Sequence, residues 1–178
     1  ADVDVKEIVV EFGAEKHGRV ASIIDKAHEK WITTWHANSN EMNRISRTEN
    51  NQGIAAIIAL PKKGPGDIYG DLLQVKIGTV VFLDGVQDPG NVGTIIRTSE
   101  AFGVQGVILG PESAGLYNTK TLRSSMGAVF RVPIAELHGK PGLESVSRFA
   151  REGFRIIAAD NGPGSTLLRD CRFGEKNL

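Results

Sequence analysis

The sequence has one cysteine, Cys171, and it lacks long apolar runs. A single cysteine permits neither an internal disulfide nor a cysteine metal cluster, which is typical of proteins from a reducing compartment. No apolar run approaches the length of about 20 residues that spans a bilayer, and the first residues lack a basic start followed by an apolar block. The sequence therefore predicts a soluble, cytoplasmic protein.

Net charge is also lacking, because 21 Lys and Arg residues balance 21 Asp and Glu residues. No global positive field attracts nucleic acid, so any surface that binds nucleic acid has to be local. Hydrophobic residues make up 40% of the 178 residues, which is enough for a packed core in one domain or in two small ones.

The common motifs of nucleotide, metal and hydrolase sites are absent as well. Gly85, Gly90 and Gly93 join a strand to a helix, but without the spacing of a dinucleotide-binding loop or a P-loop. The four histidines show no paired-ligand spacing, so no metal is expected. The G-x-S-x-G motif of many serine hydrolases does not occur. The sequence therefore supports none of these sites.

The first third of the chain has the pattern of a small α/β domain. Three- and four-residue spacing of apolar residues predicts a helix over 17–31. Apolar, β-branched runs predict strands at 5–10, 32–36 and 54–60. The last of these strands is nearly all apolar, which predicts burial on both of its faces.

Proline, glycine and charge are concentrated in PKKGPGDIYG, residues 61–70. This composition is typical of a turn-rich connection between compact units. We therefore predict a first domain over 1–62, a linker over 63–76 and a second domain over 77–178.

The segment after this boundary alternates between strand and helix patterns. Strands are expected at about 78–84, 105–110 and 154–160. Helices are expected at about 91–103 and 142–152. This alternation indicates an α/β fold with a parallel sheet wrapped by helices.

The stretch DGVQDPGNVGTIIRTSEAFG, residues 84–103, is the strongest candidate for a site. An apolar strand ends at Asp84, and a helix is expected to begin at about Asn91. The exposed N–H groups and partial positive charge of a helix start suit a phosphate, a carboxylate or a nucleotide. Two interpretations of Asn91 stay open. Its side chain only caps the helix, or Gly90 and Gly93 also let a ribose or another backbone approach it.

Arg97 lies almost opposite the apolar side of this helix. At about 100° per residue, that side collects Val92, Ile95, Ile96, Ser99, Phe102 and Gly103. Arg97 therefore points away from the helix's own core. It is either an ordinary surface arginine paired with Glu100 or a group that binds a ligand.

Two further clusters carry basic and polar residues. In KTLRSSMGAVFRVPI, residues 120–134, basic side chains surround the small residues that contact phosphate: Lys120, Arg123, Arg131, Ser124, Ser125 and Gly127. The alternative for this segment is a helix end followed by a buried strand. Near the end of the first domain, polar donors suit an RNA backbone or an exposed base: Arg44, Arg47, Asn50, Asn51 and Gln52.

Together these segments resemble the TrmH-type branch of the SPOUT class of RNA methyltransferases, in particular the enzymes that modify ribose 2′-hydroxyls in ribosomal RNA. DGVQDPGNVGTIIRTSEAFGVQGVIL resembles the family's first motif, and RSSMGAVFRVPI resembles the small-residue segment after it. RTENNQGIAAII is more loosely similar to the end of the ribosomal-protein-like domain that precedes the catalytic part. The family often has proline there, where this chain has Asn51.

The resemblance implies a fold, a cofactor and an assembly. The fold is a small ribosomal-protein-like α/β domain followed by a parallel-sheet SPOUT domain with a C-terminal trefoil knot. The methyl donor is S-adenosylmethionine, without a metal, and members are homodimers with a shared active site. Two later motifs that supply most of the S-adenosylmethionine pocket do not occur before Leu178. We therefore expect a chain incomplete at both ends, without its knot portion, that methylates poorly or not at all by itself.

The resemblance also implies roles for individual residues. Asn91 and Arg97 match the asparagine and arginine that the family uses at the target ribose. A guanidinium, with a pKa above about 12, is a poor base at neutral pH. We therefore expect Arg97 to orient the target phosphate and to stabilise developing charge, with Glu100 holding it in place. Activation of the ribose by a deprotonated arginine is the alternative. RNA contacts are expected at Arg47, Asn50, Arg123 and Ser125.

Several functions stay open at this point. The first is an RNA 2′-O-methyltransferase that acts on ribosomal RNA or, alternatively, on transfer RNA. The second is a non-catalytic RNA-binding module, in which Asn91 is only a cap and Arg97 only a phosphate contact. The third is a small α/β enzyme that uses the glycine loop for a phosphorylated metabolite.

Overall fold

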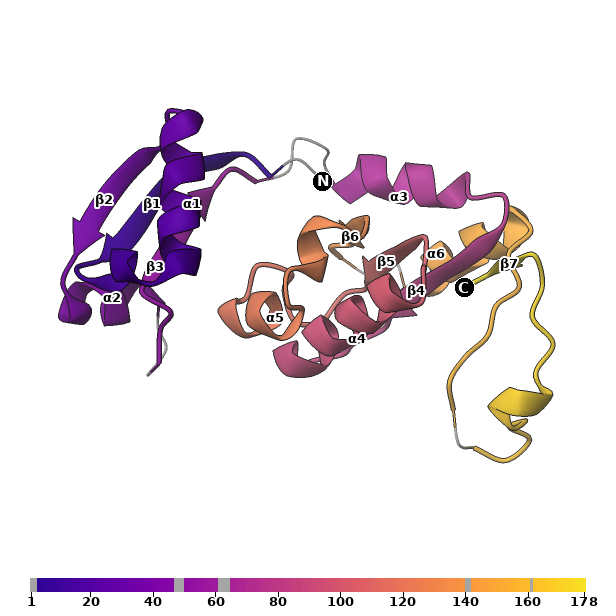
Figure 1. Cartoon of the computed structure of the whole chain (residues 1–178). Coiled ribbons are helices and arrows are strands. Elements are labelled where there is room, and N and C mark those ends of the chain that lie inside the picture. The colour runs from indigo at the N-terminus through magenta and orange to yellow at the C-terminus, as the bar shows by residue number, and fades with distance from the viewer. Residues whose placement is uncertain (1–2, 47–49, 61–64, 140–141, 161) are drawn as a thin grey trace. The chain divides into compact units, whose positions relative to one another are not determined.

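The structure is a computed structural model that describes residues 3–46, 50–60, 65–139, 142–160 and 162–178. The chain forms two compact units, Ala1–Lys62 and Lys63–Leu178 (Figure 1). Each unit has its own sheet and its own hydrophobic core.

The first unit is a three-stranded sheet with a long helix on one face. β1 (Val5–Glu11) lies in the middle, parallel to β2 (Thr33–Ala37) and antiparallel to β3 (Ile54–Ile58). α1 (Gly18–Glu29) follows β1, and α2 (Ser39–Ser46) follows β2. A 3-10 turn at Ala14–Lys16 precedes α1.

The core of the first unit lies between β1 and α1. Ile8 and Val10, two residues apart on β1, are buried against Val20 and Ala27 of α1. Because alternate residues of a strand point to opposite faces, Val9 faces the side of the sheet away from α1. The prediction that β3 is buried on both faces is wrong. β3 is an edge strand covered on one face only, and Ile57 on it is about half exposed at 53%.

The second unit is a parallel four-stranded sheet in the order β6-β5-β4-β7. The sequence predicted the parallel sheet but not this strand order. Its strands are β4 (Gly78–Leu83), β5 (Gly106–Leu109), β6 (Ile134–Glu136) and β7 (Lys176–Asn177). Its helices are α3 (Pro65–Leu73), α4 (Pro89–Ala101), α5 (Thr119–Ser124) and α6 (Gly142–Arg151). Two 3-10 turns occupy Ala128–Phe130 and Leu168–Asp170.

Both faces of this sheet are covered, so the second unit has two apolar clusters. All four residues of β5 are buried, as expected of a central parallel strand. Val107 and Leu109 belong to the cluster on the side of α4. Ile108 points the other way and joins a cluster with α3 and α6.

Residues 65–73, within the predicted linker, form helix α3 instead. Its buried residues Tyr69, Leu72 and Leu73 lie three and four positions apart, which is one face of a helix. Their burial in the core stabilises the helix, although the segment's glycines and prolines favour a turn. The linker prediction relied on composition and overlooked this apolar spacing.

The predicted strand over 154–160 is also wrong. Only Arg155 makes a ladder bridge, with Asn177, while residues 158–160 are exposed. β7 takes the position beside β4, pairing Lys176 with Gly78. The Ile157 N–H donates to the Leu178 carbonyl at 2.9 Å, so the chain follows β7 as far as Ile157, and residues 158–160 lie outside the sheet.

Candidate functional site

The loop that follows β4 is tied to the segment after β5. Gly85 has φ +66°, a left-handed conformation that suits glycine. The Ser113 hydroxyl donates to the Leu83 carbonyl at 3.0 Å and accepts from the Val86 N–H at 3.1 Å. The Ala114 N–H donates to the Val86 carbonyl at 2.9 Å. The loop is therefore fixed at the carboxyl end of β4, the end of a parallel sheet where ligands bind.

Asp88, rather than Asn91, caps helix α4. The Asp88 Oδ1 accepts a hydrogen bond from the Asn91 N–H at 2.9 Å, and Pro89 is the first helical residue. Proline suits that position because its missing N–H would have no partner within the helix. The interpretation of Asn91 as the cap is therefore wrong. Its side chain is exposed on the first turn and is not needed for capping.

Lys120 joins the start of α4 to α5. Its Nζ donates to Asp88 Oδ2 at 2.8 Å. This bond, together with the Asn91 N–H, holds the pKa of the Asp88 carboxyl below its ordinary value of 3.8. Gly90 leaves room for the pair, because a Cβ there would lie 2.7 Å from Asp88 Oδ1 and 3.0 Å from Lys120 Cε. One carboxylate thus both caps α4 and binds α5.

Gly93 lets α4 and α5 approach closely. A Cβ at Gly93 would lie 2.0 Å from the Ser124 Oγ, 2.5 Å from the Thr121 carbonyl oxygen and 2.9 Å from the Ser125 nitrogen. The Ser124 hydroxyl lies 2.7 Å from the Lys120 carbonyl oxygen and 3.3 Å from the Pro89 carbonyl oxygen. The sequence left open whether a ribose or another backbone approaches this glycine. In the structure, the backbone of α5 approaches it.

Arg97 lies on the exposed face of α4, as the helical wheel predicted. Val92, Ile96 and Ser99 of the same helix are buried, whereas Arg97 is exposed. Across the described ranges, its guanidinium makes no hydrogen bond or ion pair. The wheel is wrong at Phe102, which is 83% exposed because α4 ends at Ala101.

Glu100 pairs with Arg131 and not with Arg97, which corrects the expectation drawn from spacing. Arg131 Nε donates to Glu100 Oε1, and Arg131 Nη2 donates to Glu100 Oε2 at 2.8 Å. This two-point contact lowers the pKa of the Glu100 carboxyl and raises that of the Arg131 guanidinium. The pair joins the last turn of α4 to the residue after the 3-10 turn Ala128–Phe130.

The predicted basic cluster is largely neutralised by these pairs. Lys120 binds Asp88 and Arg131 binds Glu100. Arg123 is exposed in the last turn of α5, and no described residue pairs with it. Ser125, also expected to contact RNA, is fully buried, and its hydroxyl donates to the Leu122 carbonyl at 2.7 Å. Its prediction as an RNA contact is therefore corrected, because the side chain is inaccessible and already bonded.

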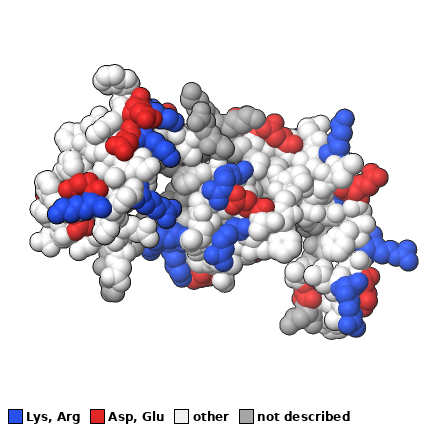
Figure 2. Space-filling model, in the orientation of Figure 1, with Lys and Arg blue, Asp and Glu red and all other residues white. Residues whose placement is uncertain are grey.

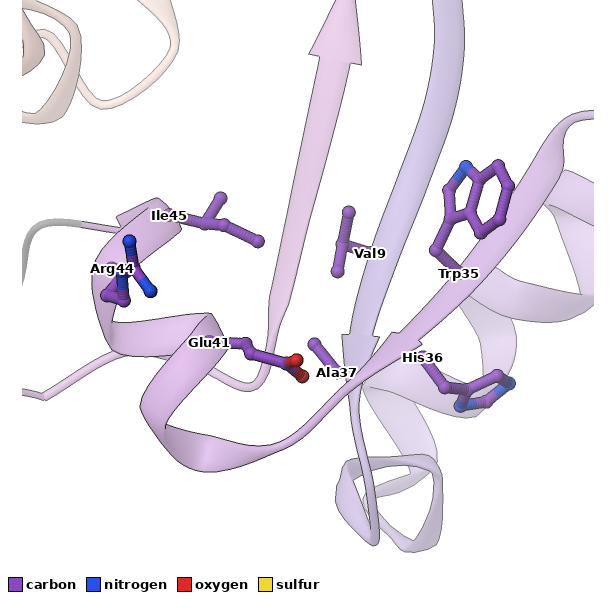
Figure 3. Close-up of a pocket in the computed structure, with 7 residues that line it drawn as sticks. All are labelled: Val9, Trp35, His36, Ala37, Glu41, Arg44 and Ile45. Carbon is purple, nitrogen blue, oxygen red and sulfur yellow. The ribbon is translucent and has the colours of Figure 1, made fainter.

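The residues of the first unit that were predicted to contact RNA also include exposed side chains and side chains that are already bonded. Asn50 is exposed, and Arg47 lies outside the described residues. Asn51 is already bonded to its own turn and to α2, since its Oδ1 accepts from the Gly53 N–H at 2.7 Å and its Nδ2 donates to Asn43 Oδ1 at 2.8 Å. Arg44 lines an open hollow (Figure 3).

That hollow is on the sheet face away from α1, and sequence reasoning did not identify it. Its lining residues are Val9, Trp35, His36, Ala37, Glu41, Arg44 and Ile45. Trp35 is 54% exposed, and its indole N–H donates to Glu7 Oε2 at 2.8 Å. The alternation along β1 signals that Val9 leaves the core, but nothing in the sequence indicates that this face stays open.

Basic and acidic side chains are interspersed on the visible face of both units (Figure 2). In the part of the chain that the structure describes, no three His, Cys, Asp or Glu residues are grouped to hold a metal ion. The helices of the described residues are also too short or too polar to span a bilayer.

Comparison with known families matches both units. Residues 78–177 match the SpoU rRNA Methylase family. Residues 1–63 match a domain described as RNA 2′-O ribose methyltransferase substrate binding. The loop after β4, α4 and α5 all fall within the first of these matches.

Curated relatives are RNA methyltransferases by name. The chain is 35% identical over 133 residues to the 23S rRNA (guanosine(2553)-2′-O)-methyltransferase RlmP of Bacillus subtilis, covering 73% of this chain and 46% of that protein. It is 29% identical over 177 residues to an uncharacterized tRNA/rRNA methyltransferase of Mycolicibacterium paratuberculosis, covering 96% of this chain and 54% of that protein. The chain thus spans about half the length of the curated relatives it matches.

Solved structures confirm the fold class. An AdoMet-bound rRNA methyltransferase from Sinorhizobium meliloti superposes with a TM-score of 0.75 and 27% identity, covering 98% of this chain and 62% of that one. A putative RNA methyltransferase of the TrmH family from Porphyromonas gingivalis superposes with a TM-score of 0.62 and 27% identity, covering 86% of this chain and 55% of that one.

Proposed function

Because this chain belongs to the SpoU rRNA Methylase family, we propose that the whole protein transfers a methyl group from S-adenosylmethionine to a ribose 2′-hydroxyl of ribosomal RNA. The observation that carries this proposal is the exposed face of α4. Asn91 and Arg97 both lie on it without a described partner, because Asp88 caps the helix and Arg131 occupies Glu100. The same helix falls in the segment that matches the family.

In this proposal Asn91 and Arg97 bind the RNA at the target nucleotide. The Asn91 amide donates and accepts hydrogen bonds at the ribose. Arg97 presents several N–H donors to the adjacent phosphate and stabilises the negative charge that develops on the attacking oxygen. Arg97 is not the base, because a guanidinium stays protonated at neutral pH. S-adenosylmethionine would supply the methyl group and leave as S-adenosylhomocysteine with the electrons of the broken sulfur–methyl bond, and the hydroxyl proton would pass to solvent.

The described residues of this edge do not by themselves fit the methyl donor. S-adenosylmethionine supplies an electrophilic methyl group, and its adenosine needs a concave, largely apolar site. The residues beside the loop are exposed or already paired: Gln87, Asp88, Asn91, Tyr117 and Lys120. We therefore assign these residues to the RNA side of the site. The matched segment is about half the length of these relatives, and we assign donor binding to the other half.

The remaining RNA contacts in the proposal come from both units. Arg123 is an exposed cation on α5, the helix that follows α4 along this unit. It suits a phosphate next to the target nucleotide. Arg47 and Asn50 are assigned to RNA binding in the first unit, which matches a substrate-binding domain by description. We place the protein in the cytoplasm, where ribosomal RNA is made in bacteria. The homodimer implied by the family resemblance is part of the same proposal.

Transfer RNA is the second candidate substrate. A relative that matches 96% of this chain carries both tRNA and rRNA in its name. The sheet edge and α4 present the same donors to either RNA.

The test uses the full-length protein with methyl-labelled S-adenosylmethionine and, in separate reactions, ribosomal RNA and transfer RNA. We expect label in ribose 2′-O-methyl groups of ribosomal RNA. Arg97→Ala should reduce transfer by about 100-fold or more, as loss of a group that stabilises developing charge does. Arg151→Ala removes an exposed arginine from α6 and is the matched control. Unchanged turnover in Arg97→Ala would remove Arg97 from the mechanism. RNA binding without transfer would favour the non-catalytic module.

A further inference from the structure

Arg97 and Glu100 are the two charged residues of α4, and they lie three positions apart. At this spacing on a helix, opposite charges are neighbours and attract each other. A salt bridge between them would occupy the guanidinium that the proposed function assigns to an RNA phosphate. The structure avoids this pairing, although both side chains are on the surface.

Arg131 engages both oxygens of Glu100. Its Nε donates to Oε1 and its Nη2 donates to Oε2 at 2.8 Å. A guanidinium fork matches a carboxylate in two parallel hydrogen bonds, which makes this contact stronger than a single one. The contact lowers the pKa of the Glu100 carboxyl below its ordinary value, because the two hydrogen bonds favour the charged carboxylate.

The chain holds Arg131 where it can reach Glu100. The 3-10 turn Ala128–Phe130 begins after Gly127, which has φ +82°. The Arg131 N–H donates to the Ala128 carbonyl at 2.9 Å, and Ala128 and Val132 are buried on either side of Arg131 in sequence. A Cβ at Gly127 would lie 3.2 Å from Arg131 Nη1, so glycine also leaves space for the guanidinium.

We propose that Arg131 is a positioning residue for RNA binding, which keeps Glu100 from pairing with Arg97 and so leaves the Arg97 guanidinium available for a phosphate of the substrate. This inference rests on the proposed function. Arg131 acts through Glu100 and not by touching RNA. Its loss therefore weakens RNA binding only while Glu100 keeps its charge.

The experiment compares KM for RNA and kcat in the full-length protein for the wild type and for three variants: Arg131→Ala, Glu100→Gln and Arg131→Ala with Glu100→Gln. Arg131→Ala should raise KM for RNA about two- to fivefold, the range over which an exposed ion pair acts. In the double variant, KM should return to the value of Glu100→Gln alone. Added salt should shrink the effect of Arg131→Ala, because it screens the Arg97–Glu100 attraction.

Two outcomes overturn the inference. A double variant as weak in RNA binding as Arg131→Ala would show that the charge of Glu100 is not the cause. A Glu100→Gln variant as weak as Arg131→Ala would show that the pair is a structural tie between α4 and the turn. Circular dichroism and thermal unfolding of each variant identify any loss of fold. A wild type without methyl transfer would contradict the proposed function, whereas an active wild type with four equal KM values contradicts only this inference.

Discussion

Replacement of Gly93 by alanine tests how closely α4 must approach α5. The new Cβ would lie 2.5 Å from the Thr121 carbonyl oxygen and 2.9 Å from the Ser125 nitrogen. These are backbone atoms, so no rotamer change relieves the contact. The third neighbour, the Ser124 Oγ at 2.0 Å, belongs to a short side chain on the same helix end. The two helices must therefore separate.

Two opposing effects set the size of the change in stability. Overpacking of a buried site destabilises by about 1–3 kcal/mol. Alanine in place of glycine within a helix stabilises by up to about 1 kcal/mol. We expect the steric effect to dominate, with a net loss of about 1–2 kcal/mol. In a unit of this size that corresponds to a fall in Tm of about 4–8 °C.

Thermal and urea unfolding of the chain, followed by circular dichroism, measure this loss. Gly70→Ala is the matched control, because Gly70 lies within helix α3 and a Cβ there meets no atom within 4 Å. It should stabilise by up to about 1 kcal/mol through helix propensity alone. If Gly93→Ala stabilises as much as Gly70→Ala does, the close packing of α4 on α5 is refuted. In the full-length protein Gly93→Ala should also lower kcat, since a shift of about 1 Å in a reacting group lowers rates about 100-fold.

The pairs around α4 give two further predictions. Asp88→Ala should lower stability through loss of the cap, whereas Asp88→Asn should retain most of it. The pKa of Asp88 is lowered in the folded state, so its pair with Lys120 stabilises the fold at pH values above the unfolded pKa. The free energy of unfolding in urea should therefore be lower for Lys120→Ala than for the wild type, and this difference should disappear as pH falls below about 4. Arg123→Ala in the full-length protein should weaken RNA binding and reduce its salt slope by about 1, whereas Ser125→Ala should leave the slope unchanged. Filter binding over a salt series measures both variants, and equal slopes would contradict the assignment of Arg123.

The sequence predicted the strand, loop and helix over 84–103 because local signals agree there. An apolar β-branched run ends at Asp84, and apolar residues then recur with helical spacing. The cap was wrong because Asp88 and Asn91 both suit an N-cap, three residues apart. Pro89 decides between them, since it fits the first helical position after Asp88. The prediction weighed the cap residues and gave too little weight to the proline.

The partners of Asp88 and Glu100 were beyond sequence reasoning for a physical reason. Lys120 lies 32 residues from Asp88, and Arg131 lies 31 residues from Glu100. Spacing within one helix suggested Arg97 for Glu100, because only neighbours on the same element can be read from a periodic pattern. Tertiary packing of α4 on α5, which depends on Gly93, brings the distant cations into reach.

These pairs explain how a chain without net charge can present a local cation, which the proposed function assigns to RNA. The 21 basic and 21 acidic residues cancel over the whole sequence, so the total carries no information about any one surface. On α4, Arg131 pairs with Glu100 and Lys120 pairs with the capping Asp88. The charge of Arg97 therefore has no partner among the described residues. Removing either paired cation should make this face less attractive to phosphate even though neither cation need touch the RNA. The arrangement of the pairs, and not the composition, thus determines the charge that the substrate meets.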